Sequence, residues 1–125
     1  MIVLDASAWI DVLTAGLDTD EHLRDGVTVP PHFDAEVVGS IRALNQRSLI
    51  DQVEAEKAVR RHLAAPFTRV FDPADIEAAW RWRESMSLTD AWYAALAKRL
   101  EATWVTADQR AGRAARMLGI DVEIV

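Results

Sequence analysis

A short apolar run that ends in a carboxylate and turns directly into a helix is the feature of this sequence that most limits its fold. Residues 2–4, Ile-Val-Leu, show no polar alternation, so they can form a strand only if both faces of that strand are covered. The run stops at Asp5, and from Ser7 onward apolar side chains recur with helical spacing. In open α/β sheets, ligands bind at junctions of this kind. The alternative is that Asp5 or Ser7 only caps the helix.

The same pattern returns near the end of the chain. Residues 103–106, Thr-Trp-Val-Thr, form another short strand candidate, and Asp108 follows the turn after it. A helical pattern then runs to Leu118, and Gly119 suits its end. Asp108 has the same alternative role as Asp5, because an aspartate before a helix is a common N-cap.

Between these two segments, strands and helices are expected to alternate. Pro31 suits the first turn of a helix, and Asp51 with Glu54 has the spacing of a capping box. Asp72 followed by Pro73 marks another helix start. Helices are predicted over residues 7–15, 32–46, 51–63, 72–83, 87–98 and 108–118, with a short one capped by Asp18 or Thr19, and strands over residues 2–4, 27–29, 68–71, 103–106 and 122–125. This alternation predicts an α/β fold, in which a mostly parallel sheet is flanked by helices.

Length and composition indicate one globular domain over residues 1–125, with 50% hydrophobic and 27% charged residues. No apolar run is long enough to span a membrane, and the N-terminus lacks the order of a signal peptide. The absence of cysteine excludes disulfides and thiolate metal sites, and a bacterial-type cytoplasm is the expected location. The net charge of −6 argues against nucleic-acid binding through bulk charge, but not against a nuclease whose acids are offset by metal ions.

Four acidic residues are expected to meet at one edge of the sheet. Parallel strands all end at the same edge, so Asp5 and Asp108, which follow strands, should lie there. Asp90 opens a helix that starts from this edge, and Glu36, one turn inside its helix, can reach it. The alternatives are that Asp90 only forms a capping box with Ser87 and that Glu36 forms a solvated ion pair. Like charges repel by about a few kcal/mol at contact in a partly buried site, so a cation must hold the four carboxylates together. All-oxygen sites select hard cations, which predicts Mg²⁺ or Mn²⁺.

The segments that carry these acids resemble the PIN-domain ribonucleases, specifically the VapC-type toxins of bacterial and archaeal toxin–antitoxin pairs. The matching segments are residues 3–8 (Val-Leu-Asp-Ala-Ser-Ala), 35–39 (Ala-Glu-Val-Val-Gly), 89–97 (Thr-Asp-Ala-Trp-Tyr-Ala-Ala-Leu-Ala) and 105–108 (Val-Thr-Ala-Asp). They lie in the family's order and near its spacing, and the similarity spans the whole chain. No single segment is specific to the family, whereas the ordered set is.

The resemblance implies a compact, three-layer α/β/α PIN-like domain with Mg²⁺-dependent endoribonuclease activity on RNA, usually as a homodimer that a small cognate antitoxin inhibits. By matching position it assigns the catalytic and metal-site acids as Asp5, Glu36, Asp90 and Asp108, and the supporting hydroxyls as Ser7 and Thr106. Some relatives carry a further acid shortly after the last aspartate, where this chain has Gln109, Arg110 and Ala111. The number of metal ions, one or two, therefore stays open.

Three further residues are candidates for contacts with other molecules. Arg110 and Arg113, just beyond the last acid, are candidate phosphate contacts, with solvated charge as the alternative role. Trp82 lies off the stripe that Ile76 and Trp80 form on their helix, which makes it a candidate for an exposed contact with a second subunit, with ordinary packing as the alternative.

Two other functions are compatible with an acidic α/β domain. A non-catalytic binding module could keep the fold and some of its acids. A phosphoacceptor signalling domain is similar in size and also binds Mg²⁺, but it needs a lysine after the last strand, and no lysine follows residues 122–125 here. The intact set of four acids favours the nuclease over both.

Overall fold

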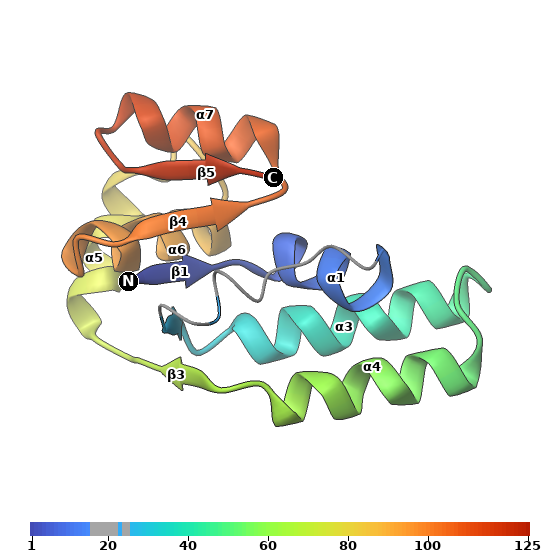
Figure 1. Ribbon diagram of the computed structural model, residues 1–125. Helices are drawn as coiled ribbons and strands as arrows, with labels where there is room; N and C mark the ends of the chain where they lie inside the picture. Colours follow the sequence, from blue (N-terminus) through green and yellow to red (C-terminus); the bar gives the residue numbers. More distant parts are fainter. Residues whose placement is uncertain (16–22, 24–25) are drawn as a thin grey trace.

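The computed structural model describes residues 1–15, 23 and 26–125, and its strands and helices alternate along the chain (Figure 1). The elements are β1 (Ile2–Leu4), α1 (Ala6–Ala15), β2 (Val27–Val29), α3 (Phe33–Gln46), α4 (Gln52–Ala64), β3 (Phe67–Arg69), α5 (Pro73–Arg81), α6 (Leu88–Arg99), β4 (Thr103–Thr106), α7 (Gln109–Met117) and β5 (Val122–Ile124). The predicted short helix capped by Asp18 or Thr19 lies outside the described residues. No described helix is both long and apolar enough to cross a membrane.

The described strands form one sheet in the order β3-β2-β1-β4-β5, and every neighbouring pair is parallel. The first strand of the chain lies in the middle, with Ile2 aligned to Val27 on one side and to Thr103 on the other. All three residues of β1 are buried, which confirms that both of its faces are covered. The carboxyl ends of β1 and β4 are therefore neighbours, and Asp5 and Asp108 follow them.

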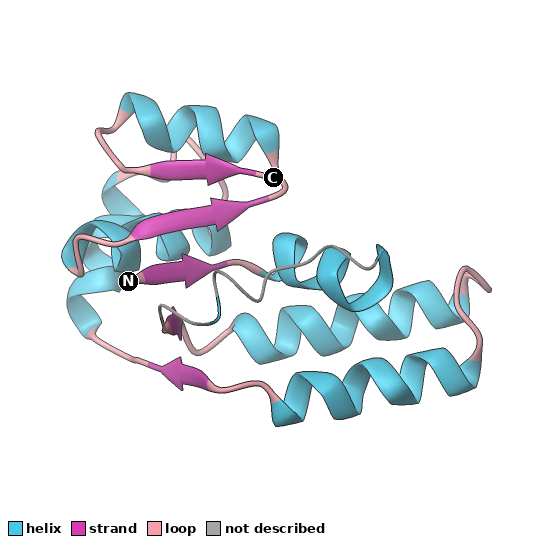
Figure 2. Cartoon of the chain, viewed as in Figure 1, coloured by secondary structure: helices cyan, strands magenta, loops and turns pink. Residues whose placement is uncertain are grey.

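Helices pack on this sheet to complete a three-layer α/β architecture (Figure 2). Helix α6 lies on β1 and β4, α5 packs on α6, and α7 packs on β5, whereas α1, α3 and α4 pack against one another. In α6, Ala91 and all residues from Tyr93 to Ala97 are buried. The uncharged stretch of α6 is thus enclosed on several sides and holds Asp90, in its first turn, near the protein interior.

Several helix ends form as their sequence signals indicate. The Asp51 carboxylate accepts from the Glu54 N–H at 2.7 Å, and the Glu54 carboxylate accepts from the Asp51 N–H at 3.3 Å, which completes the capping box. Gly119 has φ +79°, a conformation that favours glycine and ends α7. The prediction for β3 was shifted, because the strand begins at Phe67, whose ring packs 5.0 Å from that of Phe33 in the core.

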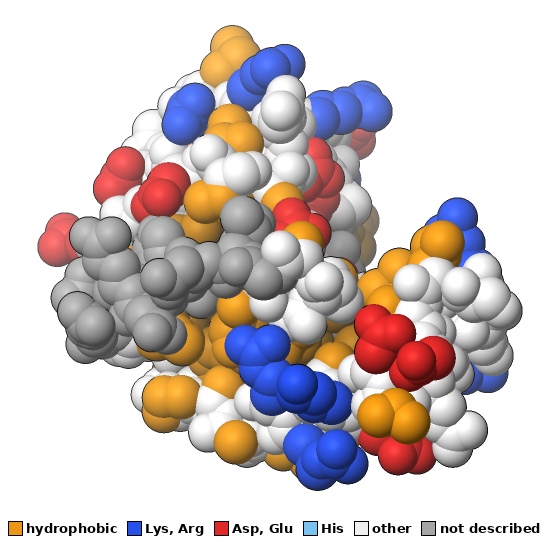
Figure 3. Space-filling model, turned by 45° about the vertical axis from the view of Figure 1, so that its right-hand side comes forward, with side chains coloured by type: hydrophobic (Ala, Val, Ile, Leu, Met, Phe, Trp, Pro, Cys, Tyr) orange, Lys and Arg blue, Asp and Glu red, His pale blue; other side chains and the backbone are white. Residues whose placement is uncertain are grey.

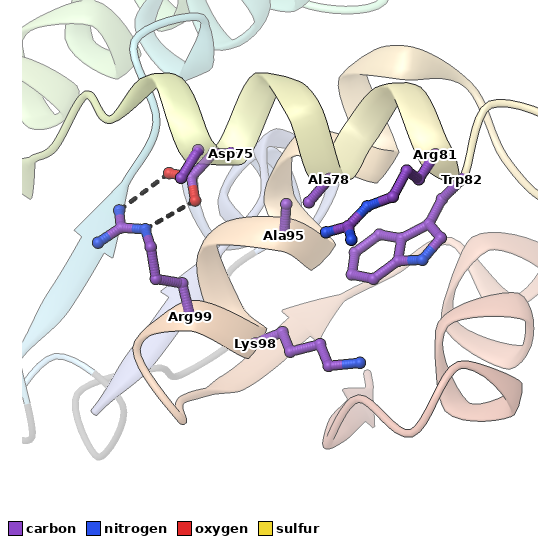
Figure 4. A pocket seen from close by; sticks show the side chains of 8 residues that line it. Asp75, Ala78, Arg81, Trp82, Ala95, Lys98 and Arg99 are labelled. Carbon is purple, nitrogen blue, oxygen red and sulfur yellow. Dashed lines mark hydrogen bonds and ion pairs between the residues drawn. The ribbon is translucent and has the colours of Figure 1, made fainter.

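The predicted orientation of α5 was wrong, and a buried ion pair explains why. Trp80 is 58% exposed and Ile76 is 45% exposed, whereas Trp82 is half-buried against the core. The inward face carries Asp75, which is 1% exposed and accepts from Arg99 Nε and Nη2 at 2.8 and 2.9 Å (Figure 4). Hydrophobic spacing alone cannot place a buried aspartate, so it assigned the wrong tryptophan to the interior.

A chain of hydrogen bonds that runs from the core to the surface joins α1, α3, α4 and β3. Trp9 Nε1 donates to His62 Nδ1 at 3.0 Å, so the ring proton of the neutral imidazole lies on Nε2. That nitrogen lies 2.7 Å from Asp34 Oδ1 and donates to it. Arg69 donates to both oxygens of Asp34, at 2.6 and 2.8 Å. The chain fixes α1 against α3, and these two segments carry part of the acidic edge.

Candidate active site

A small pocket at the carboxyl edge of the sheet brings together the four predicted acids. Its volume is about 70 Å³, and its lining residues are Asp5, Ala6, Ser7, Glu36, Asp90, Tyr93 and Asp108. Asp5 and Asp108 follow the adjacent strands β1 and β4, while Glu36 and Asp90 lie in the first turns of α3 and α6. The acids thus converge from four separate segments of the chain.

Asp5 is the most enclosed of the four acids, with 3% of its surface exposed. Its Oδ1 accepts from the Ser7 hydroxyl at 2.6 Å and from the Ala8 N–H at 3.1 Å. Burial nevertheless raises the pKa of Asp5, because it outweighs the hydrogen bonds that favour the carboxylate, and nearby Asp90 raises it further. A cation beside this carboxylate would remove that penalty.

Two hydroxyls join the ends of β1 and β4. Ser7 Oγ accepts from the Ala107 N–H at 3.0 Å and lies 3.4 Å from Thr106 Oγ1. Thr106 Oγ1 in turn accepts from the Asp108 N–H at 3.0 Å. The Asp108 carboxylate accepts from the Ala111 N–H at 3.0 Å and caps α7. Asp108 therefore both caps a helix and lines the pocket, so the two roles proposed for it are compatible.

Asp90 is held by the start of α6. Its N–H donates to Ser87 Oγ at 3.2 Å, which places Ser87 at the N-cap as its spacing predicted. Burial raises the pKa of Asp90, and the charges of Asp108 and Glu36 raise it further. In the absence of a cation, the charges around Asp90 therefore disfavour its ionised form.

Glu36 has two partners that the sequence did not identify. The Tyr93 hydroxyl donates to Glu36 Oε1 at 2.7 Å, and His32 Nε2 lies 3.4 Å from the same oxygen and 3.2 Å from the Thr89 carbonyl. Burial raises the pKa of Tyr93 and lowers that of His32, so both act as neutral groups. The available signal was spacing, because Tyr93 lies one helical turn after Asp90 and His32 one turn before Glu36.

The donor atoms of this pocket suit a hard divalent cation. Carboxylate and hydroxyl oxygens line it, which are the ligands that Mg²⁺ prefers, and about 70 Å³ exceeds the roughly 30 Å³ that one water occupies. Within the described part of the chain, no three acidic or histidine side chains are already gathered tightly enough to hold an ion. The carboxylates would therefore have to draw closer when a cation binds.

Of the two predicted phosphate contacts, Arg110 lies beside the acids. It lines a second hollow that also includes Asp90 and Asp108. Arg113 instead donates to the Gln109 side-chain oxygen at 3.1 Å on the exposed side of α7. Charge is also unevenly spread over the surface, since one face gathers Lys and Arg side chains at its lower centre (Figure 3). A net charge of −6 therefore coexists with locally basic surface.

Comparison with known proteins finds similarity over nearly the whole chain. A family model described as the PIN domain matches residues 2–117. The chain is 36% identical over 128 residues to ribonuclease VapC12 from Mycobacterium tuberculosis, covering 99% of this chain and 97% of that protein. Among solved structures, PAE2754 from Pyrobaculum aerophilum superposes with a TM-score of 0.73 at 21% identity, covering 90% of this chain and 84% of that one. Mycobacterium tuberculosis VapC20, described as a toxin that cleaves the sarcin-ricin loop, gives a TM-score of 0.61 at 20% identity and 96% coverage of both chains.

Proposed function

The chain belongs to the PIN-domain family, and from this premise we propose that it is a metal-dependent endoribonuclease, the toxin of a toxin–antitoxin pair. Its similarity to a ribonuclease spans nearly the full length of both proteins, which supports RNA cleavage as the reaction. Family membership also removes the phosphoacceptor signalling domain as an alternative. A PIN-fold module that binds RNA without cleaving it is the remaining rival.

The observation that carries the proposal is the convergence of four carboxylates around one small pocket. Burial raises the pKa of Asp5 and of Asp90, so the charged forms of these acids destabilise the metal-free fold. A purely structural role does not require such an arrangement, whereas a divalent cation makes it favourable. We therefore assign the cofactor as Mg²⁺, with Mn²⁺ as a substitute.

Each residue of the pocket then has a role. Asp5, Asp90 and Asp108 would hold the cation, which, when bound, polarises a phosphate and lowers the pKa of a water molecule. Ser7 supports Asp5 through its 2.6 Å hydrogen bond. Glu36, whose Oε1 is held by Tyr93, would orient the attacking water or complete the metal shell. Attack by water in line with the leaving group would give a 5′-phosphate and a 3′-hydroxyl.

A pair of matched variants tests this proposal. Asp108 and Asp51 are both N-cap residues, and asparagine is as good a cap as aspartate, so Asp108→Asn and Asp51→Asn should fold equally well. Only Asp108 lines the acidic pocket. RNA cleavage in Mg²⁺ should therefore fall by orders of magnitude in Asp108→Asn alone, and EDTA should abolish it in the wild type. Equal cleavage by the two variants would contradict the proposed site, and cleavage that persists in EDTA would contradict the metal.

We also propose cytoplasmic action, a homodimer and a small antitoxin that covers the acidic edge. The dimer contact is reassigned from Trp82 to the outer face of α5, where Ile76 and Trp80 lie one turn apart and are exposed. Light scattering should show a dimer that Trp80→Glu converts to a monomer. A wild type that is monomeric at micromolar concentration would refute the dimer, and a co-purified partner that leaves cleavage unchanged would refute the inhibitor.

A further inference from the structure

A second hollow beside the acidic pocket is lined by side chains of both charges. Its volume is about 420 Å³, and its lining residues are Arg83, Glu84, Ser85, Met86, Ser87, Asp90, Asp108, Arg110 and Ala111. We call it the arginine pocket. Asp90 and Asp108 belong to both pockets, so the arginine pocket continues from the acidic edge towards Arg83 and Arg110.

We propose that the arginine pocket binds the phosphate of the RNA nucleotide that neighbours the one cleaved, with Arg83 and Arg110 as its phosphate ligands. This inference rests on the proposed nuclease function and adds the path of the substrate. RNA is a polyanion, and four carboxylates repel it wherever they are not neutralised. Two guanidinium groups next to these acids would fix the register of the strand, because phosphate contacts position a nucleic acid without reading its sequence.

Arg83 is held in place before any ligand arrives. Its Cζ lies 4.2 Å from the centre of the Trp80 ring, and Nη1 donates to the Trp80 carbonyl at 2.9 Å. A guanidinium fixed by stacking and by a hydrogen bond loses little conformational entropy on binding phosphate. Its contact with Glu84 is weak, because the two groups are 3.8 Å apart and the Glu84 side chain is 89% exposed. A phosphate can therefore displace Glu84 from Arg83.

Arg110 is subject to two opposing electrostatic effects, because the carboxylates of Asp90 and Asp108 line the same hollow and favour a positive charge, whereas the start of α7 disfavours one. It lies in the first turn of α7, near the positive end of the helix dipole, and this turn contains no acid after the Asp108 cap. A bound anion would compensate both the helix end and the arginine. Because these two effects oppose each other, Arg110→Ala is expected to change thermal stability little while weakening RNA binding, which separates a ligand contact from a structural one.

Binding is measured on the full chain carrying Asp5→Asn, which prevents cleavage during the titration. The probe is a fluorescein-labelled single-stranded oligouridylate of about 16 nucleotides in Mg²⁺, followed by anisotropy at several salt concentrations. Arg83→Ala and Arg110→Ala should each raise Kd about tenfold and reduce the slope of log K against log salt by about 0.7. Arg47→Ala, which removes an exposed arginine from the loop between α3 and α4, is the matched control and should match its parent.

A cleavage assay with the same substitutions in the otherwise wild-type chain separates this inference from the proposed function. The arginine variants should raise KM more than they lower kcat.

The possible outcomes separate the two proposals. If the wild type cleaves RNA, but Arg83→Ala and Arg110→Ala both bind and cleave it like Arg47→Ala, the arginine pocket is refuted while the nuclease stands. If neither the parent nor the wild type binds the probe in Mg²⁺, the pocket is also refuted. If the wild type fails to cleave RNA, the proposed function is refuted, whereas arginine-dependent binding of the probe would still support the pocket as an RNA site. An acidic peptide competing better than the probe would reassign the pocket to a protein partner.

Discussion

Replacing Asp5 with asparagine should leave the metal-free protein as stable as the wild type or more stable. The amide oxygen can still accept from Ser7 and Ala8, while the buried charge is removed. Because the folded pKa of Asp5 lies above its ordinary value of 3.8, the penalty is absent below pH 3.8 and grows as pH rises through the folded pKa. Each unit of that shift corresponds to about 1.4 kcal/mol at neutral pH. Any gain in stability should therefore appear near neutral pH and vanish below pH 3.8.

The same substitution should remove most of the stabilisation by Mg²⁺. A cation at about 100 times its Kd adds about 2.7 kcal/mol to a fold that alone can bind it, which for a chain of this length raises Tm by about 10 °C. Thermal unfolding of the wild type and Asp5→Asn, each in EDTA and in excess Mg²⁺, measures both effects, with Asp51→Asn as the control for the charge change. Equal Mg²⁺ shifts in the wild type and Asp5→Asn would refute the assignment of Asp5 to the metal site.

Three other substitutions or conditions test separate parts of the structure. Tyr93→Phe removes the donor to Glu36 and should lower kcat about tenfold in a cleavage assay; an unchanged kcat would show that this hydrogen bond does not position the glutamate. Asp75→Asn removes the buried partner of Arg99 and leaves it the longer 3.8 Å contact with Asp72, so it should cost about 2 kcal/mol in urea unfolding, and a loss below about 1 kcal/mol would contradict a buried pair. Hydrogen bonding to Arg69 is the main cause of the lowered pKa of Asp34. The ionised Asp34 carboxylate should therefore stabilise the fold modestly above pH 3.8, and this stabilisation should be lost as pH falls through the folded pKa. Asp34→Asn should remove this pH dependence in thermal unfolding.

The sequence predicted the acidic edge well because its signals are local. Asp5 and Asp108 each follow a short apolar strand, and parallel strands must share an edge, so their proximity needed no knowledge of side-chain packing. Asp90 and Glu36 followed from helix starts and from helical spacing. The structure confirms that these four segments meet around one pocket.

The interactions that sequence reasoning missed join segments far apart in the chain. Tyr93 reaches Glu36 across 57 positions, and nothing in the local pattern of α6 or α3 indicates that their faces meet. The face of α5 was misassigned because a buried Asp75 is invisible to hydrophobic periodicity until its partner, 24 positions later, is in place. Pairing between charged or polar groups over such distances depends on the packing of whole helices, which composition and spacing do not encode.

The central position of β1 has a consequence for the protein while it is being synthesised. Its neighbour β4 begins about a hundred residues later, so the strand that ends in Asp5 lacks one of its two partners until most of the chain exists. Such long-range pairing forms late, because the chain must close a large loop before any contact compensates for the lost entropy. A nascent chain that stops before residue 103 can contain Asp5, Glu36 and Asp90 but cannot hold them in their final arrangement. The acidic pocket therefore cannot form until synthesis has passed Asp108, and products truncated before that residue lack the pocket.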